Sequence, residues 1–318
     1  MMSIKSINFR VFTVSIGVLT CLVTLVGLLG RFWWGFELAT HFRVQYVVVL
    51  ACCALLLLAG RRRGWAAGFT VIALLNATLV APSYNKPAEP PVSDNKTVLR
   101  ALLANVNSAN RDYRRIRDTL TDWNPDFVVL LEATPWLMGR LTDLADRYPY
   151  RIAAPREDNF GIAFLSRRPF LQANVVGFGA AGLPSTVAEF EIDRHRLVIV
   201  GTHPLPPIGA IRAWSRNEQL LKLAEFARQT PHPLLLLGDL NLTPWSPYFE
   251  RLLAGSGLRD SRHGRGLFPT WPAGWPPLWI PIDHALFSTG IGIRQRQTGP
   301  ALGSDHYPVI VDFQVVGS

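Results

Sequence analysis

The chain has 318 residues, a hydrophobic fraction of 49%, a mean hydropathy of +0.18 and a formal net charge of +9. This length suits one domain with an accessory segment. The basic excess is uneven, because residues 1–90 hold eight Lys or Arg and two Glu, whereas residues 91–318 hold 24 Lys or Arg and 21 Asp or Glu. The charge therefore gives little support to nucleic-acid binding, which usually needs a basic face on the domain itself.

Three uncharged apolar runs lie near the N-terminus, at residues 11–30, 44–60 and 64–81. The first is as long as a bilayer core, and the other two are slightly shorter. A signal peptide is the alternative for the first run, but the run is too long, no small-residue cleavage pattern follows it, and two more runs come after. We therefore predict an all-α segment of three transmembrane helices over residues 1–81, which embeds the protein in the inner or plasma membrane.

Lysines and arginines flank these runs unevenly. The loop 31–43 holds only Arg31 and Arg43, whereas five basic residues precede the first run or separate the second from the third: Lys5, Arg10, Arg61, Arg62 and Arg63. By the positive-inside rule those five face the cytoplasm. An odd number of spans then places the C-terminal domain outside the cytoplasm, in the periplasm.

Residues 82–96 are polar, rich in proline and without periodicity, which predicts an extended linker before a domain at 97–318. All three cysteines precede this linker, so the domain has neither a disulfide framework nor thiolate metal ligands. Many strands with a few interleaved helices suit an α+β fold of two packed sheets with helices outside. We expect strands at 98–104, 127–132, 161–165, 186–192, 196–202, 233–238, 284–287 and 307–314, and helices near 111–123, 135–147, 212–229 and 246–254.

Polar side chains stand at the ends of six of these apolar runs. Each alone is typical of a turn, and a lone histidine at a strand end is more often structural than catalytic. Six such endings in one domain are hard to explain as turns, because strand ends are where a rigid scaffold exposes functional groups. Carboxylates, amides and imidazoles together could hold a hard cation and bind a phosphate. The residues are Asn105, Asn107, Glu132, His203, Asp239, Asn241, Asp283, Asp305 and His306.

The order Asn-x-Asn, Glu, His, Gly-Asp-x-Asn, Asp, Ser-Asp-His resembles that of the endonuclease/exonuclease/phosphatase superfamily, which includes pancreatic-type deoxyribonucleases, abasic-site endonucleases, sphingomyelinases and inositol-phosphate phosphatases. The resemblance covers about residues 97–315, and its specific motifs are Gly238-Asp239-Leu240-Asn241 and Ser304-Asp305-His306. It implies a four-layer α-β-β-α sandwich in a membrane-anchored, bacterial-type member that hydrolyses phosphoric esters with Mg²⁺ or Mn²⁺.

The resemblance also implies a role for each motif residue. Glu132 is expected to be the principal metal ligand, because an ionised carboxylate suits Mg²⁺. Asn107 and Asp305 are expected to support the metal, and Asn105 to orient that region.

The remaining motif residues are expected to act on the substrate. Asp239 accepts a proton from the attacking water, and Asn241 holds that water or stabilises a phosphoryl oxygen. His306 donates to the phosphate, and Asp283 fixes the tautomer of that imidazole. His203 faces the leaving group, as the second histidine does in the deoxyribonuclease and sphingomyelinase branches.

These residues favour a membrane-anchored, Mg-dependent phosphoesterase that cleaves a phosphodiester or phosphomonoester with an activated water. Two alternatives stay open: a catalytically inactive family member that serves as a membrane-attached binding module, and a nuclease acting on DNA. Every motif position keeps a chemically competent side chain, which favours an enzyme. A lipid head group, a nucleotide and a nucleic acid all fit as substrates, since function depends on loops grafted on the fold. No obligate protein partner is evident.

The Trp-rich loop, residues 267–281, carries three Trp and five Pro just before Asp283. One interpretation is a rigid loop whose rings are buried in the core. The other is that some rings are exposed at the mouth of the cleft, where Trp favours a membrane interface. The second would suit a lipid-linked or membrane-proximal phosphoester.

Overall fold

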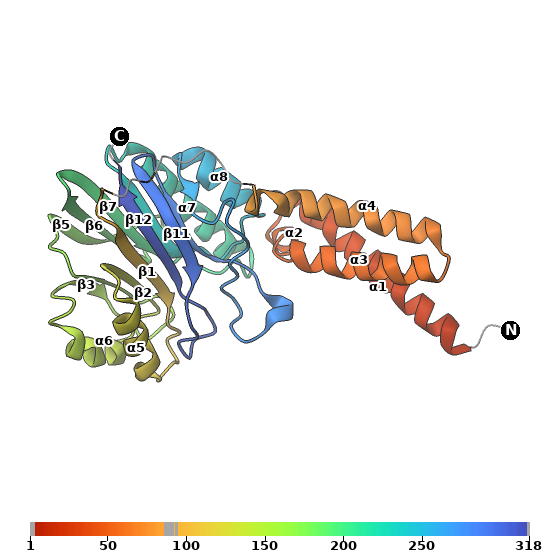
Figure 1. Ribbon diagram of the computed structural model, residues 1–318, viewed down its shortest axis with the longest axis horizontal. Coiled ribbons are helices and arrows are strands. Elements are labelled where there is room, and N and C mark those ends of the chain that lie inside the picture. The colour runs from red at the N-terminus through yellow and green to blue at the C-terminus, as the bar shows by residue number, and fades with distance from the viewer. Residues whose placement is uncertain (1–3, 86–91, 93–94, 317–318) are drawn as a thin grey trace.

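The computed structural model describes residues 4–85, 92 and 95–316, with side chains from residue 9 onwards in the first range. Figure 1 shows a layered body of strands and helices from which a bundle of long helices projects, with α1 beginning at the far end of the bundle. Most of the predicted linker lies outside the described residues. Its first residues, η1 (Ala81–Ser83), contact the body, where the amides of Gly264 and Gly266 donate to Pro82 and Ser83.

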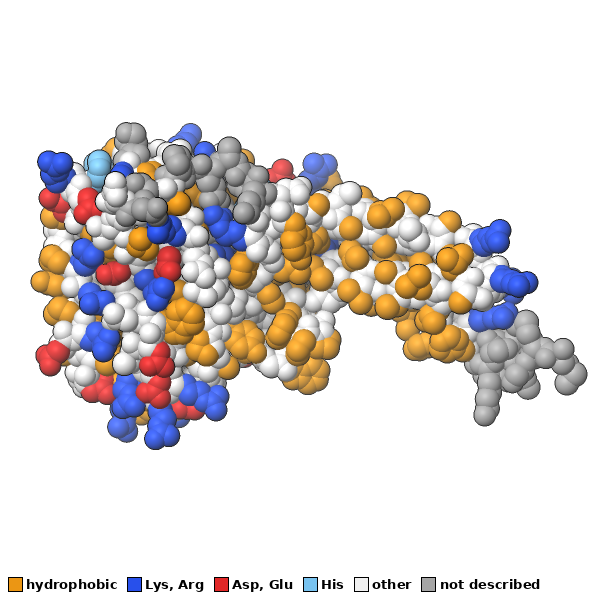
Figure 2. Space-filling model, viewed as in Figure 1, with side chains coloured by type: hydrophobic (Ala, Val, Ile, Leu, Met, Phe, Trp, Pro, Cys, Tyr) orange, Lys and Arg blue, Asp and Glu red, His pale blue; other side chains and the backbone are white. Residues whose placement is uncertain are grey.

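Three long helices form the N-terminal bundle at the three positions where apolar runs were found: α1 (Ile4–Leu28), α3 (Arg43–Ala59) and α4 (Arg63–Val80). A short helix, α2 (Trp34–Leu38), lies between the first two, beside the body. By length and composition, two described segments could cross a membrane, Phe9–Leu28 and Arg63–Ser83, whereas α3 is shorter at 17 residues. Figure 2 shows apolar side chains along the bundle and basic ones near its far end.

A buried polar cluster holds the three bundle helices together. Arg43, expected in the loop 31–43, is instead the first residue of α3 and is buried. Its guanidinium donates to the Asn76 side chain of α4 at 3.0 Å and to the Thr24 carbonyl of α1 at 3.3 Å. Asn76 also donates to the Thr24 hydroxyl. Such groups are expensive to bury among apolar helices unless they pair with one another, as they do here.

The first sheet has six strands in the order β11-β12-β1-β2-β4-β3. Its central pair, β1 and β2, is parallel, and the other pairs are antiparallel. The strands are β1 (Leu99–Asn105), β2 (Phe127–Leu131), β3 (Tyr150–Ala154), β4 (Ile162–Ser166), β11 (Ile291–Thr298) and β12 (Val309–Val315).

The second sheet also has six strands, in the order β5-β6-β7-β8-β10-β9, with β7 and β8 as its parallel pair. Strand β8 is buried along its whole length, which explains its unbroken apolar run Leu234–Leu237. The strands are β5 (Gln172–Gly177), β6 (Pro184–Ile192), β7 (His195–Thr202), β8 (Leu234–Asp239), β9 (Arg259–Asp260) and β10 (Asp283–Phe287).

The two sheets pack face to face around a core that includes Phe127, Phe190 and Phe313. Helices α5 (Tyr113–Trp123) and α6 (Pro135–Arg140) cover the first sheet, followed by η2 (Leu141–Leu144). Helices α7 (Ala210–Gln229) and α8 (Pro247–Ser256) cover the second. This is an α+β arrangement of two mixed sheets flanked by helices, as predicted.

Several elements differ from the predicted ones. The expected helix 135–147 ends at Arg140 and continues as the 3-10 turn η2. Strands β3, β5, β9 and β11 were not predicted. All four are edge strands, and residues of β5 are largely exposed. Strands in such places need no continuous apolar run, so the pattern that marks a buried strand is missing from their sequences.

Candidate active site

The two parallel strand pairs bring their carboxyl ends to one edge of the sandwich. Asn105 ends β1, Glu132 follows β2, His203 follows β7, and Asp239 ends β8. The antiparallel neighbours begin at the same edge, because Asp283 of β10 is the register partner of Asp239, and Val309 of β12 that of Leu103. The predicted residues thus meet through sheet topology, although they are far apart in the sequence.

Glycine allows a close approach of the strands at this edge. A Cβ atom on Gly238 would lie 2.5 Å from the carbonyl oxygen of Thr202, which is far too close for any other residue. Strands β7 and β8 can therefore lie tightly side by side just before His203 and Asp239. The histidine Nε2 lies 3.4 Å from the Asp239 carboxylate.

Glu132 is held by two donors from the segment that follows β1. Its Oε1 accepts from the Asn105 side chain at 3.0 Å, and its Oε2 accepts from the Ser108 amide at 2.9 Å. Its backbone is left-handed, with φ of 59°, and Asn107 and Asn241 are likewise at 60° and 52°. Left-handed backbone is costly for residues other than glycine and gathers at functional sites. These three predicted residues share that property.

Asp305 lies in the loop before β12 of the first sheet and is fixed by two side chains. Its Oδ1 accepts from Asn107 at 2.8 Å, and its Oδ2 accepts from the indole of Trp271 at 3.2 Å. The Trp-rich loop thus contributes directly to the site. Sequence reasoning did not assign this contact, because it joins two segments whose packing only the fold decides.

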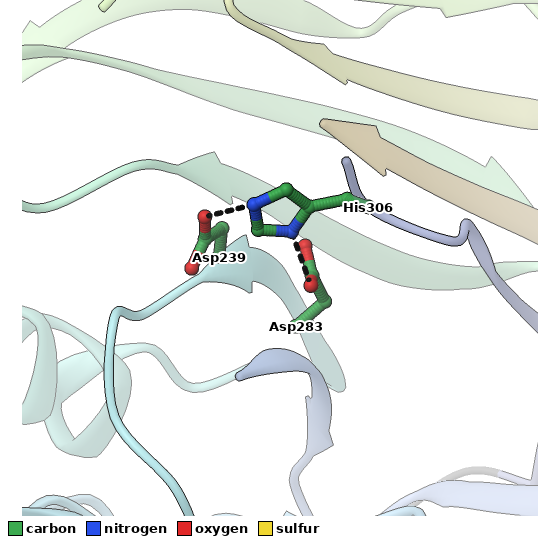
Figure 3. Close-up of side chains that lie close together, drawn as sticks. All are labelled: Asp239, Asp283 and His306. Atoms are coloured by element: carbon green, nitrogen blue, oxygen red, sulfur yellow. Dashed lines mark hydrogen bonds and ion pairs between the residues drawn. The ribbon is translucent and has the colours of Figure 1, made fainter. Parts of the chain in front are cut away.

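A chain of contacts runs through the buried centre of the site (Figure 3). His306 lies between two carboxylates, with Nδ1 at 2.8 Å from Asp283 Oδ2 and Nε2 at 3.7 Å from Asp239 Oδ2. Asn105 also donates to Asp239, at 3.2 Å. The Thr270 hydroxyl accepts from the Asp283 amide and fixes the start of β10.

The electrostatics of this centre follow from burial and from opposite charges. Burial lowers the pKa of His306, but the charges of Asp283 and Asp239 outweigh it and raise that pKa to about 10. Burial opposes ionisation of Asp239, but the charges of His306 and His203 outweigh it and lower its pKa. The pKa of His203 is raised, because contact with Asp239 outweighs burial. An anionic Asp239 therefore lies between two imidazoles that favour their protonated forms.

Asp239, Asp283 and His306 form a group that could hold a metal ion, since their ligand-type atoms all lie within 4.8 Å of one another. The imidazole is engaged by both carboxylates, and its raised pKa favours imidazolium, which offers no lone pair. Glu132 and Asp305 line the cleft as well and also offer carboxylate oxygens.

A cavity of about 310 Å³, which we call the cleft, joins these groups. Six predicted residues line it: Glu132, His203, Asp239, Asn241, Asp305 and His306. Asn105, Asn107 and Asp283 contact them from behind. Ten further residues line it: Leu38, His41, Asn159, Phe160, Pro206, Pro207, Ile208, Trp271, Ile280 and Ile282. The pair Asp158-Asn159 just before β4 fits a turn or a place in the cleft lining, with the turn favoured by sequence, and the structure puts Asn159 in the lining.

Leu38 ends α2 and His41 lies just before α3, so the connection between α1 and α3 forms part of the cleft wall. His41 is buried, and its Nδ1 lies 3.0 Å from the Thr243 hydroxyl. Its Nε2 has no hydrogen-bond partner among the described residues. A histidine between two apolar runs gives no local signal of a site, and only the docking of the bundle places it here.

The three tryptophans of the Trp-rich loop occupy different environments. Trp271 lines the cleft, Trp275 is 65% exposed, and Trp279 lines a second cavity against α3. The loop is therefore not simply part of the core, because one ring is exposed and another lines the cleft.

The family of this chain follows from its match to a protein-family model. The model of the endonuclease/exonuclease/phosphatase family matches residues 102–306. The chain belongs to this family. Its members are phosphoester hydrolases. None of the curated proteins compared with the chain matches it.

Solved structures share the fold of the C-terminal domain. A humanised TDP2 from D. rerio has a TM-score of 0.57 and 16% identity, over 68% of this chain and 99% of that one. The endonuclease/exonuclease/phosphatase from Beutenbergia cavernae has a TM-score of 0.54 and 21% identity, over 69% and 72%. The human Nocturnin catalytic domain with bound sulfate has a TM-score of 0.56 and 17% identity, over 70% and 96%.

Proposed function

We propose that this protein is a membrane-anchored, Mg-dependent phosphoesterase that uses an activated water to hydrolyse a phosphodiester or phosphomonoester. One observation carries the proposal. An unbroken series of contacts links Glu132 through Asn105 and Asp239 to His306 and Asp283 at the edge of the cleft. A cation ligand, a proton acceptor and a cationic donor thus lie within reach of one bound phosphoryl group.

The donor set beside the cleft fits Mg²⁺ or Mn²⁺. Glu132, after β2, and Asp305, before β12, supply carboxylate oxygens from the first sheet, and Asn105 and Asn107 orient them through hydrogen bonds. Oxygen ligands with several retained waters are what Mg²⁺ prefers. When bound, such an ion would neutralise charge on the phosphoryl oxygens.

The side chains on the other wall would activate water and stabilise charge. Asp239 has a lowered pKa and one carboxylate oxygen fixed by the Asn241 amide at 3.0 Å, so it is an anionic acceptor for the proton of the attacking water. The Asn241 side-chain NH₂ donates to Pro204, which leaves its carbonyl oxygen as an acceptor for that water.

The two histidines would act on the phosphate. His306 as imidazolium donates through Nε2, while Asp283 accepts from Nδ1 and keeps the ring oriented. His203 would be the second donor and would act on the leaving group. Its ring is packed against Phe160, with centroids 5.6 Å apart, which limits its movement.

The bundle supplies the membrane anchor in this proposal. Its outward side chains include many exposed leucines and valines, and a soluble monomer rarely exposes so extended an apolar surface. The exposed Arg61, Arg62 and Arg63 lie at the turn from α3 to α4, at the end of the bundle away from the body (Figure 1), which supports a cytoplasmic far end and a periplasmic site.

The direct test is hydrolysis of bis-p-nitrophenyl phosphate by the full chain in detergent with Mg²⁺. We expect activity that EDTA abolishes and that Asp239→Asn lowers by about two orders of magnitude or more. Asp118→Asn, which removes an exposed carboxylate paired with Arg117, is the matched control and should retain activity.

The same assay separates the alternatives. A wild-type chain inactive on this ester, on nucleotides, on lipids and on DNA would identify a binding module instead. Activity confined to DNA would identify a nuclease, a possibility raised by the D. rerio TDP2 structure that holds a single-strand DNA product. No Lys or Arg is among the described residues that line the cleft, which argues against DNA.

A further inference from the structure

A second cavity, of about 360 Å³, lies between α3 and the Trp-rich loop. Val44, Val48 and Val49 line it from the helix, and Trp279 and Pro281 line it from the loop. We call it the α3 pocket. Its lining is apolar except for Gln45, whose amide donates to the Trp279 carbonyl at 2.9 Å and ties the helix to the loop. Its volume lies within the range of about 300–1,000 Å³ typical of small-molecule sites.

The α3 pocket and the cleft share both of their walls. On the loop, Trp279 and Pro281 face the pocket, whereas Ile280 and Ile282 face the cleft. On the N-terminal segment, His41 lines the cleft and Val44 lines the pocket. The two cavities thus lie on opposite faces of segment 279–282, and an elongated molecule that occupies both would pass over this segment, with its polar end in the cleft and its apolar end in the pocket.

The position of His41 sets the depth of the cleft relative to the membrane. The apolar run of α3 begins at Val44, three residues later. Three residues span at most about 10 Å of chain, so the cleft lies within that distance of the predicted hydrocarbon boundary. Lipid phosphates lie at this level, just outside the hydrocarbon core.

The surroundings of the cleft suit a lipid better than a soluble polyanion. Leu38, Pro206 and Ile208 line it, and Ile208 is 64% exposed. His41 is 6% exposed, and its Nε2 has no partner among the described residues, so a ligand oxygen in the cleft would satisfy it. A buried polar atom without a partner is costly, and a ligand commonly supplies the missing contact.

We propose that the substrate is a membrane lipid phosphoester whose phosphate binds in the cleft and whose hydrocarbon chain lies in the α3 pocket. This inference rests on the proposed phosphoesterase function. Water adds to phosphorus, the bond from phosphorus to the leaving oxygen breaks, and the lipid is held by its chain during the reaction.

The test compares two phosphodiesters with one leaving group, hexadecyl p-nitrophenyl phosphate and methyl p-nitrophenyl phosphate, with the full chain in detergent micelles. Each buried methylene can raise kcat/KM about fourfold, until the pocket is full. We expect the wild type to prefer the hexadecyl ester at least tenfold. Val48→Trp, which fills the pocket, should lower that preference about tenfold. Leu55→Trp is the matched control, because Leu55 lies on α3 but is 67% exposed and outside the pocket.

A wild-type preference near one would identify a soluble substrate and overturn the lipid proposal. An equal loss of preference in both variants would also overturn it, because the pocket would then have no special role. The proposed function fails separately if the wild type hydrolyses neither ester.

Photocrosslinking with a hexadecyl phosphate that carries a diazirine then tests whether hydrocarbon binds in the α3 pocket, without requiring catalysis. Crosslinks concentrated at residues 44–49 or 267–281 support the pocket as a hydrocarbon site. Crosslinks spread evenly over the exposed bundle surface, Leu55 included, overturn it.

Discussion

The carboxylate of Glu37 and the guanidinium of Arg216 form a buried ion pair between the N-terminal segment and the C-terminal domain, with an N···O distance of 2.5 Å. Glu37 also accepts from the Ser246 hydroxyl, which caps α8, at 2.7 Å. Arg216 donates in addition to the carbonyl of Asn241 at 3.2 Å. The contact that fixes the bundle to the domain therefore ends on the backbone of a predicted catalytic residue.

Replacing Glu37 by Ala should destabilise the protein and slow hydrolysis. Removing one partner of a buried ion pair costs about 3–5 kcal/mol, because the other charge remains buried and unpaired. Thermal unfolding of the full chain in detergent measures the first effect, and kcat on bis-p-nitrophenyl phosphate the second. The double variant Glu37→Met/Arg216→Met should be more stable than Glu37→Ala. If Glu37→Ala unfolds at the wild-type temperature, the pair does not hold the bundle in place.

Replacing Glu132 by Gln should weaken metal binding while it retains the fold. Glutamine can keep the hydrogen bond from the Ser108 amide, but it lacks the charge that a divalent cation needs. We expect the Mg²⁺ concentration for half-maximal activity to rise at least tenfold and kcat to fall by about two orders of magnitude. Titration of activity with Mg²⁺ measures both. Unchanged Mg²⁺ dependence would assign the cation to other residues.

Replacing Asp283 by Asn should lower kcat by about two to four orders of magnitude with little change in KM. An asparagine can present its NH₂ to His306 Nδ1, which favours the wrong ring tautomer and removes the charge that stabilises imidazolium. The ¹⁵N chemical shifts of the His306 ring report the tautomer directly. Wild-type shifts with reduced activity would contradict this explanation.

Acidification should destabilise the protein through His284, which follows Asp283 on β10 and therefore lies on the opposite face of that strand. Burial lowers the pKa of His284 to about 4, Asp260 opposes this, and Arg296 and Arg262 add to it. The unfolded chain, with a pKa near 6.5, binds the proton first, so stability falls as pH drops from about 6.5 to about 4.

The loss should reach about 2 kcal/mol at pH 5. His284→Gln can still donate to the Leu242 carbonyl and should show a smaller decrease in unfolding temperature between pH 7 and pH 5. An identical decrease in both proteins would show that other groups cause the pH dependence.

Three crossings with the far end of the bundle in the cytoplasm, as proposed, would place the C-terminus outside the cytoplasm. An alkaline phosphatase fused to the C-terminus should be active, and a green fluorescent protein fused there should be dark. The reverse pattern would mean that one helix does not cross, and α3 is the first candidate because it has only 17 residues.

The sequence by itself determined which residues lie at strand ends. Leu234–Leu237 and Phe127–Leu131 are continuous apolar runs, and a strand buried on both faces requires such a run, so the places of Asp239 and Glu132 could be predicted locally. The three N-terminal helices could likewise be predicted locally, because each coincides with a long uncharged apolar run. Strands β5 and β11 were not, because residues with exposed or mixed environments leave no such pattern.

Only the tertiary structure decided how the bundle meets the site. His41, Glu37 and Trp271 reach their partners Thr243, Arg216 and Asp305, which lie in distant parts of the chain. A periodic pattern reports which face of an element is buried, but it does not say which other element covers that face. The α3 pocket and its place beside the cleft depend on that packing, so they could be found only once the chain was folded.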